Sequence, residues 1–209
     1  MGLPQLVKLV NDAQQAGLSS DGTTSATELS FLAGVAYEPR IARIAEIGFN
    51  GGFSSFTFLS ANPQAEVVSF DLCAFDYSLP AKAHLDELFP GRHTLIPGDS
   101  TATVPKFAEE NPELRFDLIF IDGGHEYEVA RADLHNTRAL ATEDTILVID
   151  DLTPWKPWGR GPTQAWLEAL DAGRNSQRFI VQDGLITMTL DPSGQSSRVW
   201  ALGGYLGLD

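Results

Sequence analysis

The sequence predicts an α/β protein with a doubly wound, mainly parallel sheet and a C-terminal antiparallel hairpin. From residue 43 onward, short apolar strand-like runs alternate strictly with segments of helical character. Such alternation is typical of parallel sheets with helices on both faces, the Rossmann-like arrangement. A length of 209 residues suits one substantial domain. We therefore expect a single domain over residues 1–209, with residues 1–40 as an N-terminal helical cap and residues 41–209 as the core.

Two helices are expected before the first strand. Residues 3–17 show an amphipathic pattern that Gly17 ends. Ser25 is placed to cap a second helix, Glu28 completes a capping box, and Pro39 ends the helix. The apolar face of the first helix is expected to contain Leu3, Leu6, Val7 and Val10. The two helices either pack on the core or form a lid over a cofactor or substrate.

The alternating part of the chain begins with residues 43–55, which indicate a strand, a glycine-rich turn and the start of a helix. Further strands are expected at residues 66–71, 93–96, 116–122 and 145–150, and further helices at residues 79–88, 101–110, 126–142 and 162–172. The last two strand-like runs are residues 178–190 and 198–206. Residues 191–194 separate these runs and predict a hairpin that closes the sheet edge.

Composition excludes several classes of protein. A formal net charge of −14 argues against nucleic acid and anionic membranes as partners, since both require a basic surface. No apolar run approaches the roughly 18 residues of a membrane-spanning helix. Cys73 is the only cysteine, which excludes an intrachain disulfide and a thiolate metal site. The N-terminus does not resemble a signal peptide, so a cytoplasmic protein is expected. Whether it is a monomer or a homo-oligomer is left open.

The glycine-rich turn indicates a ligand site. Gly48, Gly51 and Gly52 permit backbone conformations that other residues avoid, and a helix N-terminus follows them. Asn50 replaces the second glycine of the dinucleotide pattern G-x-G-x-x-G. Glu46 at the strand end repels a pyrophosphate but suits an ammonium group or a ribose hydroxyl. A zwitterionic nucleoside such as S-adenosylmethionine (SAM) fits, and an ordinary tight turn is the alternative.

Acidic residues gather where the predicted strands end, which is the edge where open parallel sheets bind ligands. Asp71 lies 23 residues after Gly48, the usual distance of a carboxylate that holds ribose hydroxyls. Asp99 and Ser100 would lie against the adenine, and a helix cap is the alternative for Asp99. The residues predicted to bind the cofactor are Glu46, Gly48, Asn50, Gly52, Ser54, Asp71, Leu72, Asp99, Ser100 and Asp122.

A second group of acidic residues follows the fourth and fifth strands. Asp122 ends one and Asp150–Asp151 ends the other, so their carboxylates can meet. Three hard oxygen ligands suit Mg²⁺ better than zinc. Neighbouring strand residues face opposite sides, so the chain must bend at Asp151 if both are to reach one ion. His125, beyond a flexible Gly-Gly, could act there as a general base.

Each of these assignments has a structural alternative. His125 could be a helix-start residue bonded to the backbone, and Asp150–Asp151 could cap a helix. The other histidines are interpreted as structural: His84, His93 and His135. Trp155 and Trp158, in a loop rich in proline and glycine, could form a wall for an aromatic or sugar substrate, with Trp166 adding to it. Ordinary packing explains these tryptophans equally well.

The runs EIGFNGG, SFDL, PGDS, FDLIFIDGGHEY and IDD resemble the class I SAM-dependent methyltransferases, in particular the bacterial group related to macrocin and macrolide-sugar O-methyltransferases of natural product biosynthesis. The resemblance covers about residues 40–155. It implies metal ligation by Asp122, Asp150 and Asp151, with His125 as base. Catechol O-methyltransferase is similar in layout, with Asp-Asn in place of Asp150–Asp151. This sequence departs from the group at Asn50 and in its N- and C-terminal segments, where substrate identity is encoded.

Together these observations predict a SAM-dependent, Mg²⁺-assisted O-methyltransferase for a small molecule: a sugar, polyketide or phenol. A metal-independent methyltransferase and a non-catalytic SAM-binding module are the alternatives. An NAD-dependent oxidoreductase is disfavoured by Asn50 and Glu46.

Overall fold

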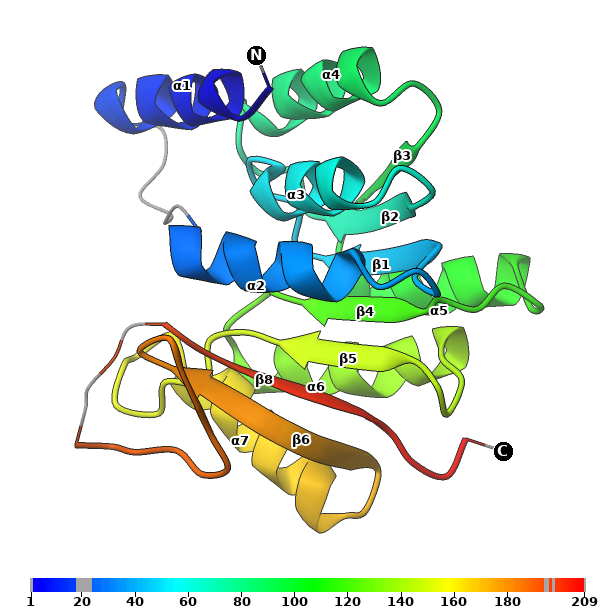
Figure 1. The fold of residues 1–209 in the computed structure, drawn as a ribbon, viewed down its shortest axis with the longest axis vertical. Coiled ribbons are helices and arrows are strands. Elements are labelled where there is room, and N and C mark those ends of the chain that lie inside the picture. Colours follow the sequence, from blue (N-terminus) through cyan, green and yellow to red (C-terminus); the bar gives the residue numbers. More distant parts are fainter. Residues whose placement is uncertain (1, 18–23, 194–195, 197, 209) are drawn as a thin grey trace. The chain divides into compact units, whose positions relative to one another are not determined.

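The computed structural model describes residues 2–17, 24–193, 196 and 198–208. By its internal contacts the chain divides into two compact units, Met1–Asp99 and Ser100–Asp209. Figure 1 shows the helices and strands of each unit in chain order. In the described part of the chain, no helix combines the length and the apolar character that crossing a membrane requires.

The first unit contains three parallel strands in the order β3-β2-β1. Its elements are α1 (Gly2–Gln15), α2 (Ala26–Ala36), β1 (Arg43–Ile47), α3 (Phe53–Ala61), β2 (Glu66–Asp71), α4 (Ser78–Leu88) and β3 (His93–Pro97). All three strands lie where the sequence predicts them, because each is a short segment with several β-branched or other apolar residues. The Ser25 side chain accepts a hydrogen bond from the Glu28 amide at 3.2 Å, which confirms the predicted cap of α2.

The two N-terminal helices pack within the first unit, where α1 contacts α3 and α4 and α2 contacts α3. The predicted face of α1 is only partly right. Leu6 and Val10 are buried, whereas Val7 is 37% exposed. Ala13 completes the buried stripe, because residues three and four apart share one helix face. Gly17 follows the helix with φ 71°, the left-handed conformation of a helix stop.

The second unit contains β4 and β5 as a parallel pair, followed by antiparallel pairs of β5 with β8, β8 with β6 and β6 with β7. Its elements are α5 (Ser100–Glu110), β4 (Leu118–Ile121), α6 (Tyr127–Asn136), the 3₁₀ helix η1 (Thr137–Leu140), β5 (Ile146–Ile149), α7 (Arg160–Asp171), β6 (Asn175–Gln182), β7 (Leu185–Thr187) and β8 (Val199–Tyr205). The helix expected over residues 126–142 ends at Asn136 and continues as η1.

The C-terminal hairpin is confirmed, since β6 and β8 pair in antiparallel orientation. The continuous strand expected over residues 178–190 is wrong. Gln182 pairs with Leu185, so Asp183 and Gly184 form a two-residue turn with φ 53° and 75°. Positive φ at both central residues is the requirement of a type I′ hairpin turn, and Asp-Gly is one of its preferred sequences. Gly194, which the sequence places in the separating turn, lies outside the described residues.

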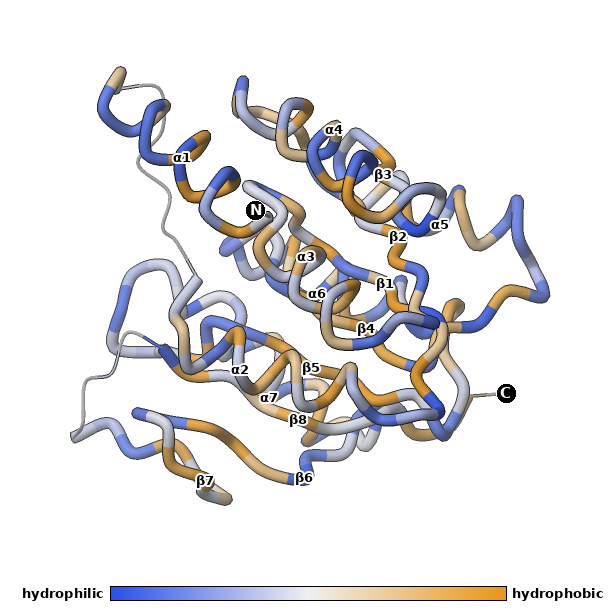
Figure 2. Tube along the Cα trace, turned by 45° about the horizontal axis from the view of Figure 1, so that its top comes forward, coloured by the Kyte–Doolittle hydropathy of each residue, from blue (hydrophilic) through white to orange (hydrophobic). Residues whose placement is uncertain are grey.

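The core of the second unit is formed by its strands. Every residue of β4, β5 and β8 is buried, as continuous apolar runs predict for strands covered on both faces. Figure 2 shows apolar residues gathered along β4 and β5. Gly203 in β8 allows close packing, because a Cβ there would lie 2.0 Å from the Ser176 carbonyl oxygen and 3.0 Å from the Trp166 ring.

Candidate functional site

The glycine-rich turn of the first unit follows β1 and leads into α3. Gly48, Asn50 and Gly52 all adopt positive φ, at 94°, 47° and 75°. Asparagine is among the few residues that tolerate the left-handed conformation, which explains how Asn50 replaces a glycine. The Gly48 amide donates to the Phe70 carbonyl oxygen at 2.8 Å, which ties the turn to β2. The turn therefore keeps its left-handed shape despite its departure from the glycine pattern.

Asp71, at the end of β2, holds this turn. Its Oδ2 accepts hydrogen bonds from the amides of Phe49 at 2.8 Å and Asn50 at 2.9 Å. Its Oδ1 accepts from the amide of Cys73 at 2.6 Å. The side chain is half-buried, and a carboxylate offers about four acceptor positions. Asp71 thus has a structural role that the sequence did not predict, while its predicted contact with ribose remains a prediction.

Two aromatic residues lie beside the turn. The Tyr77 hydroxyl donates to Asn50 Oδ1, and the Tyr77 ring stacks on Phe75 at a centroid distance of 5.2 Å. The sequence analysis missed both, although their position directly after the Asp71 strand end marked them as neighbours of the ligand edge. Leu72 is 67% exposed. The Gly98 amide donates to the Asp71 carbonyl oxygen at 2.8 Å, which brings the segment before Asp99 to the same strand ends.

Glu46 lies inside the first unit, with no exposed surface. Its Oε1 accepts from the Ser54 hydroxyl, and its Oε2 accepts from the Ser55 and Ser69 hydroxyls, each at 2.5 Å. Burial raises the pKa of Glu46, and the three hydroxyl donors oppose that rise. Ser54 and Ser55 belong to the first turn of α3, where the helix dipole favours a negative charge. The structure brings Glu46 and Ser54 together, and their predicted contact with a cofactor stays a prediction.

His93 completes this buried polar cluster. Its Nε2 lies 2.9 Å from the Ser69 hydroxyl oxygen and 3.2 Å from the Ser55 hydroxyl oxygen, and its ring stacks on Phe49. Burial lowers the pKa of His93 to about 3. The structural role expected for this histidine is consistent with its place at the start of β3, beside the hydroxyls that bind Glu46.

His93 gives a testable pH dependence of stability. A folded-state pKa of about 3 lies below the ordinary value of 6.5, so the unfolded chain binds more protons between these values. The free energy of unfolding should therefore fall as pH falls from 6.5 to 3. The fall in the wild type should exceed that in His93→Gln by up to about 1.4 kcal/mol per pH unit. Urea unfolding at several pH values measures both slopes.

The raised pKa of Glu46 adds stability as pH falls, but it acts in the wild type and the variant alike. His84→Gln is a suitable control, since His84 is a half-buried histidine on α4 of the same unit. Parallel pH profiles of the wild type and His93→Gln would show that His93 is not held neutral by the fold.

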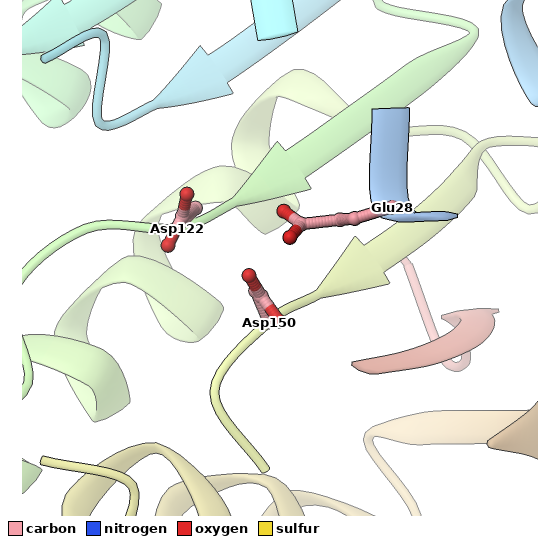
Figure 3. Close-up of side chains that lie close together, drawn as sticks. All are labelled: Glu28, Asp122 and Asp150. Carbon is pink, nitrogen blue, oxygen red and sulfur yellow. The ribbon is translucent and has the colours of Figure 1, made fainter. Parts of the chain in front are cut away.

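The acidic residues of the second unit lie at the ends of adjacent strands. Ile121 of β4 pairs with Ile149 of β5, so Asp122 and Asp150 follow side by side. Figure 3 shows both side chains leaving their strand ends; Glu28, also labelled there, belongs to α2 of the first unit. One carboxylate oxygen of Asp122 lies within 4.8 Å of one of Asp150. The predicted meeting of these two carboxylates is therefore observed.

A small cavity adjoins the two carboxylates. Its lining includes Asp122, His125, Asp150 and Asp151, all in the second unit. The cavity volume of about 10 Å³ is close to the room that one water molecule or one small cation needs. Carboxylate oxygens are the ligands that Mg²⁺ prefers. The donor set and the room both fit the cation that the sequence predicts.

His125 and Asp151 contact each other directly. His125 Nε2 lies 2.8 Å from Asp151 Oδ2. Asp151 has φ 59°, so the chain bends there as the sequence analysis required. This bend lets two residues adjacent in sequence face one cavity, which an extended strand would not allow. His125 thus gains a defined carboxylate partner that sequence spacing alone did not reveal.

The loop from β5 to α7 returns to His125. A Cβ added to Gly161, in the first turn of α7, would lie 2.2 Å from the His125 carbonyl oxygen and 2.6 Å from the Tyr127 amide nitrogen. The next residue, Pro162, lines the cavity. Sequence reasoning missed both residues, since only the folded chain shows what approaches a glycine.

The tryptophans of this region divide into two groups. Trp155 donates through Nε1 to the Ser196 carbonyl oxygen at 2.5 Å, and Trp166 is buried and donates to Gln177 Oε1 at 3.0 Å. Both have the packing role that was one of the two alternatives. Trp158 is 40% exposed, and the Lys156 ammonium lies 5.9 Å from the centroid of its ring. Of the three, Trp158 is the most exposed, while Trp155 is half-buried.

Comparison with protein families identifies the class. Residues 45–152, more than half of the chain, match the family model described as a methyltransferase domain. The chain belongs to this family and is a SAM-dependent methyltransferase. Its match spans the glycine-rich turn, Asp71, Asp122 and Asp150. No curated protein matches the sequence.

Solved structures agree on the fold. The O-methyltransferase TomG from Streptomyces achromogenes, involved in tomaymycin synthesis and solved with SAM, is 18% identical with a TM-score of 0.73 over 97% of this chain and 89% of its own. An O-methyltransferase from Bacillus cereus in complex with SAH (S-adenosylhomocysteine) is 18% identical with a TM-score of 0.71 over 95% and 90%. CalS11, a TDP-rhamnose 3′-O-methyltransferase of calicheamicin biosynthesis, is 22% identical with a TM-score of 0.62 over 95% and 91%. These similarities confirm the predicted Rossmann-like fold.

Proposed function

We propose that this methyltransferase transfers the methyl group of SAM to a hydroxyl group of a small molecule, such as a sugar, a polyketide or a phenol. The observation that carries the proposal is the cavity that Asp122, His125 and Asp150 line together. A carboxylate pair that can hold a divalent cation and an imidazole that can take a hydroxyl proton are groups that activate a hydroxyl for methyl transfer. TomG is involved in tomaymycin synthesis and CalS11 is a TDP-rhamnose 3′-O-methyltransferase, which supports a natural product or sugar substrate for this chain.

In this proposal the first unit binds the methyl donor. The turn from Gly48 to Gly52 would face the donor's amino acid end, since the dipole of α3, which begins directly after the turn, favours its carboxylate. Asp71 would accept from the ribose hydroxyls with the acceptor positions that its three amide bonds leave. The remaining residues proposed to bind SAM are Glu46, Asn50, Ser54, Leu72, Asp99, Ser100 and Asp122.

The second unit would supply the chemistry at the acceptor oxygen. Asp122 and Asp150 would hold Mg²⁺, which lowers the pKa of a hydroxyl group beside it. His125 would take the hydroxyl proton. The substrate oxygen would then form a bond to the methyl carbon as the carbon–sulfur bond breaks, with S-adenosylhomocysteine as the leaving product. Positioning contributes much of the rate gain in such a displacement. Asp151, the third ligand in the sequence prediction, lines the same cavity.

The proposal also covers the domain organisation, the location and the partners of the protein. A single domain over residues 1–209, with residues 1–40 as its helical cap, is supported by solved structures that match nearly the whole chain. A cytoplasmic location is part of the proposal, and the net charge of −14 supports the absence of nucleic-acid and anionic-membrane partners. Metal-independent methylation is the competing mechanism, with Asp150 and Asp151 serving only the structure.

Calorimetry and a chelation assay test the proposal. S-adenosylhomocysteine should bind the wild-type protein without Mg²⁺, and a catechol probe should bind measurably only when S-adenosylhomocysteine and Mg²⁺ are both present. Methyl transfer to a panel of catechols and nucleotide sugars should stop in EDTA and return with added Mg²⁺. Full activity in EDTA would reject the metal and favour the metal-independent enzyme. Absence of S-adenosylhomocysteine binding would reject the proposed donor site.

A further inference from the structure

We propose that Asp151 and Gly161 are positioning residues that hold the His125 imidazole at the cavity, and that Asp151 acts through His125 rather than as a ligand of the cation. This inference rests on the proposed function, in which His125 takes the hydroxyl proton. It assigns to Asp151 a role different from the one that its place beside Asp150 implies. Gly161 has no role in the sequence prediction.

The first observation is the fixed direction of the Asp151 side chain. Its carboxylate meets His125 Nε2 at 2.8 Å and is largely buried. The backbone at Asp151 and directly after it is held by two hydrogen bonds: the Leu152 amide donates to the Val199 carbonyl oxygen at 2.8 Å, and the Thr153 amide donates to the Asp151 carbonyl oxygen at 2.7 Å. With φ 59°, Asp151 turns the chain at this point. The carboxylate therefore presents a fixed acceptor to the imidazole.

The second observation concerns the backbone that carries His125. Two glycines, Gly123 and Gly124, precede His125, and its side chain is 47% exposed. The first turn of α7 lies against the backbone from His125 to Tyr127, so closely that Gly161 has no room for a Cβ. This close approach limits where the His125 backbone can move.

The start of α7 is itself anchored. Thr163 donates through Oγ1 to the Gly159 carbonyl oxygen at 2.6 Å, and Trp166 is buried and bonded to Gln177 of β6. A Cβ on Gly159 would lie 2.4 Å from the Thr153 carbonyl oxygen, so this end of the loop is also tightly packed. Two independent contacts, one to the imidazole and one to the backbone, thus fix His125.

The chemical consequence is the orientation of a base. With Nε2 turned to Asp151, the substrate proton would pass to Nδ1, and the imidazolium formed would have a carboxylate beside it. The same division of roles, with a carboxylate that orients an imidazole, operates in hydrolases of unrelated fold. A displacement of about 1 Å in such a group can cost about 100-fold in rate.

The test combines four single variants with two double variants: Asp151→Asn, Gly161→Ala, Asp150→Asn, His125→Ala, and each of the first two combined with His125→Ala. Mn²⁺ binding, followed by electron paramagnetic resonance, separates ligands from positioning residues. Asp151→Asn and Gly161→Ala should bind Mn²⁺ within about threefold of the wild type, whereas Asp150→Asn should bind it far more weakly. Asp151→Asn and Gly161→Ala should lower kcat by about 10- to 100-fold with little change in KM.

The double variants decide whether the effect passes through His125. Each change should add nothing once His125 is alanine, because residues that act as one unit are not additive. NMR of ¹³C-labelled histidine, with the His125 signal assigned by its loss in His125→Ala, should show a shifted or broadened ring signal in both single variants. Asp171→Asn, at the exposed end of α7, and Gly34→Ala, where a Cβ meets nothing within 4 Å, are the matched controls.

Three results would overturn the inference. Loss of Mn²⁺ binding in Asp151→Asn to the level of Asp150→Asn would make Asp151 a ligand. Full additivity with His125→Ala would show that these residues do not act through His125, and an unchanged His125 ring signal in both variants would show that they do not hold it. Wild-type turnover in His125→Ala would instead reject the proposed base, while the ring signal would still report whether Asp151 and Gly161 hold the imidazole.

Discussion

Replacement of His125 by alanine is expected to lower kcat by about 10²- to 10⁴-fold, the usual contribution of a positioned general base. The imidazole lies at the cavity beside Asp122 and Asp150, and its removal leaves the hydroxyl proton without an acceptor. Binding of S-adenosylhomocysteine should be unchanged, because the proposed donor contacts lie almost wholly in the first unit. Single-turnover kinetics with saturating donor measures the chemical step, and calorimetry measures the affinity for the product.

His135→Ala is the matched control, since this histidine is exposed on α6 and outside the cavity. It should keep full turnover. If His125→Ala kept the wild-type kcat at every pH, His125 would have no part in proton transfer, and the structural alternative of a histidine at the start of α6 would stand. A rise in KM with unchanged kcat would mean that His125 binds the substrate without taking its proton.

The strands were predictable because their signals are local. Each parallel strand is a short run with several apolar residues, and β4 and β5 are wholly apolar and buried throughout. The meeting of Asp122 and Asp150 was predictable for the same reason, since neighbouring parallel strands bring their carboxyl ends to one edge. The fold class and the two carboxylates beside the cavity could therefore be predicted from the sequence.

Two predictions are wrong because two local sequence signals compete in each case. Asp183-Gly184 is a strong hairpin signal, yet the apolar residues on both sides of it suggested one long strand. Val7 was placed on the buried face of α1 because it is apolar, but the stripe follows Leu6, Val10 and Ala13. In both cases the apolar character of the residues suggested the prediction, whereas the geometry of the turn and of the helix determines the structure.

The remaining features depend on tertiary contacts that no local pattern contains. Glu46 accepts a hydrogen bond from Ser69 of β2, and the Ser69 hydroxyl also contacts His93 of β3, so these buried bonds could not be predicted from the turn that Glu46 precedes. Gly161 is required by the backbone at His125, far from it in sequence. The position of a glycine in the sequence does not show which distant backbone segment will pack against it. The same holds for the contact between Asp151 and His125.

Replacement of Asp71 by alanine should have the largest effect on donor binding. The change removes the acceptor of three amides, those of Phe49, Asn50 and Cys73. Hydrogen bonds to a charged group contribute about 1.5–3 kcal/mol each when buried, and half-exposure here allows water to replace part of them. We expect the free energy of unfolding to fall by about 2–4 kcal/mol and the affinity for S-adenosylhomocysteine to fall at least about 100-fold.

The two effects separate the structural role of Asp71 from its proposed contact with ribose. Asp71→Asn keeps one acceptor oxygen and should retain part of the turn, while its loss of charge still weakens bonds to ribose hydroxyls. Asp76→Asn, an exposed neighbour on the same loop, should change neither quantity. Urea unfolding and calorimetry give both values for each variant. A destabilised Asp71→Ala that still bound S-adenosylhomocysteine with wild-type affinity would mean that Asp71 only shapes the turn, and the ribose would then require another acceptor.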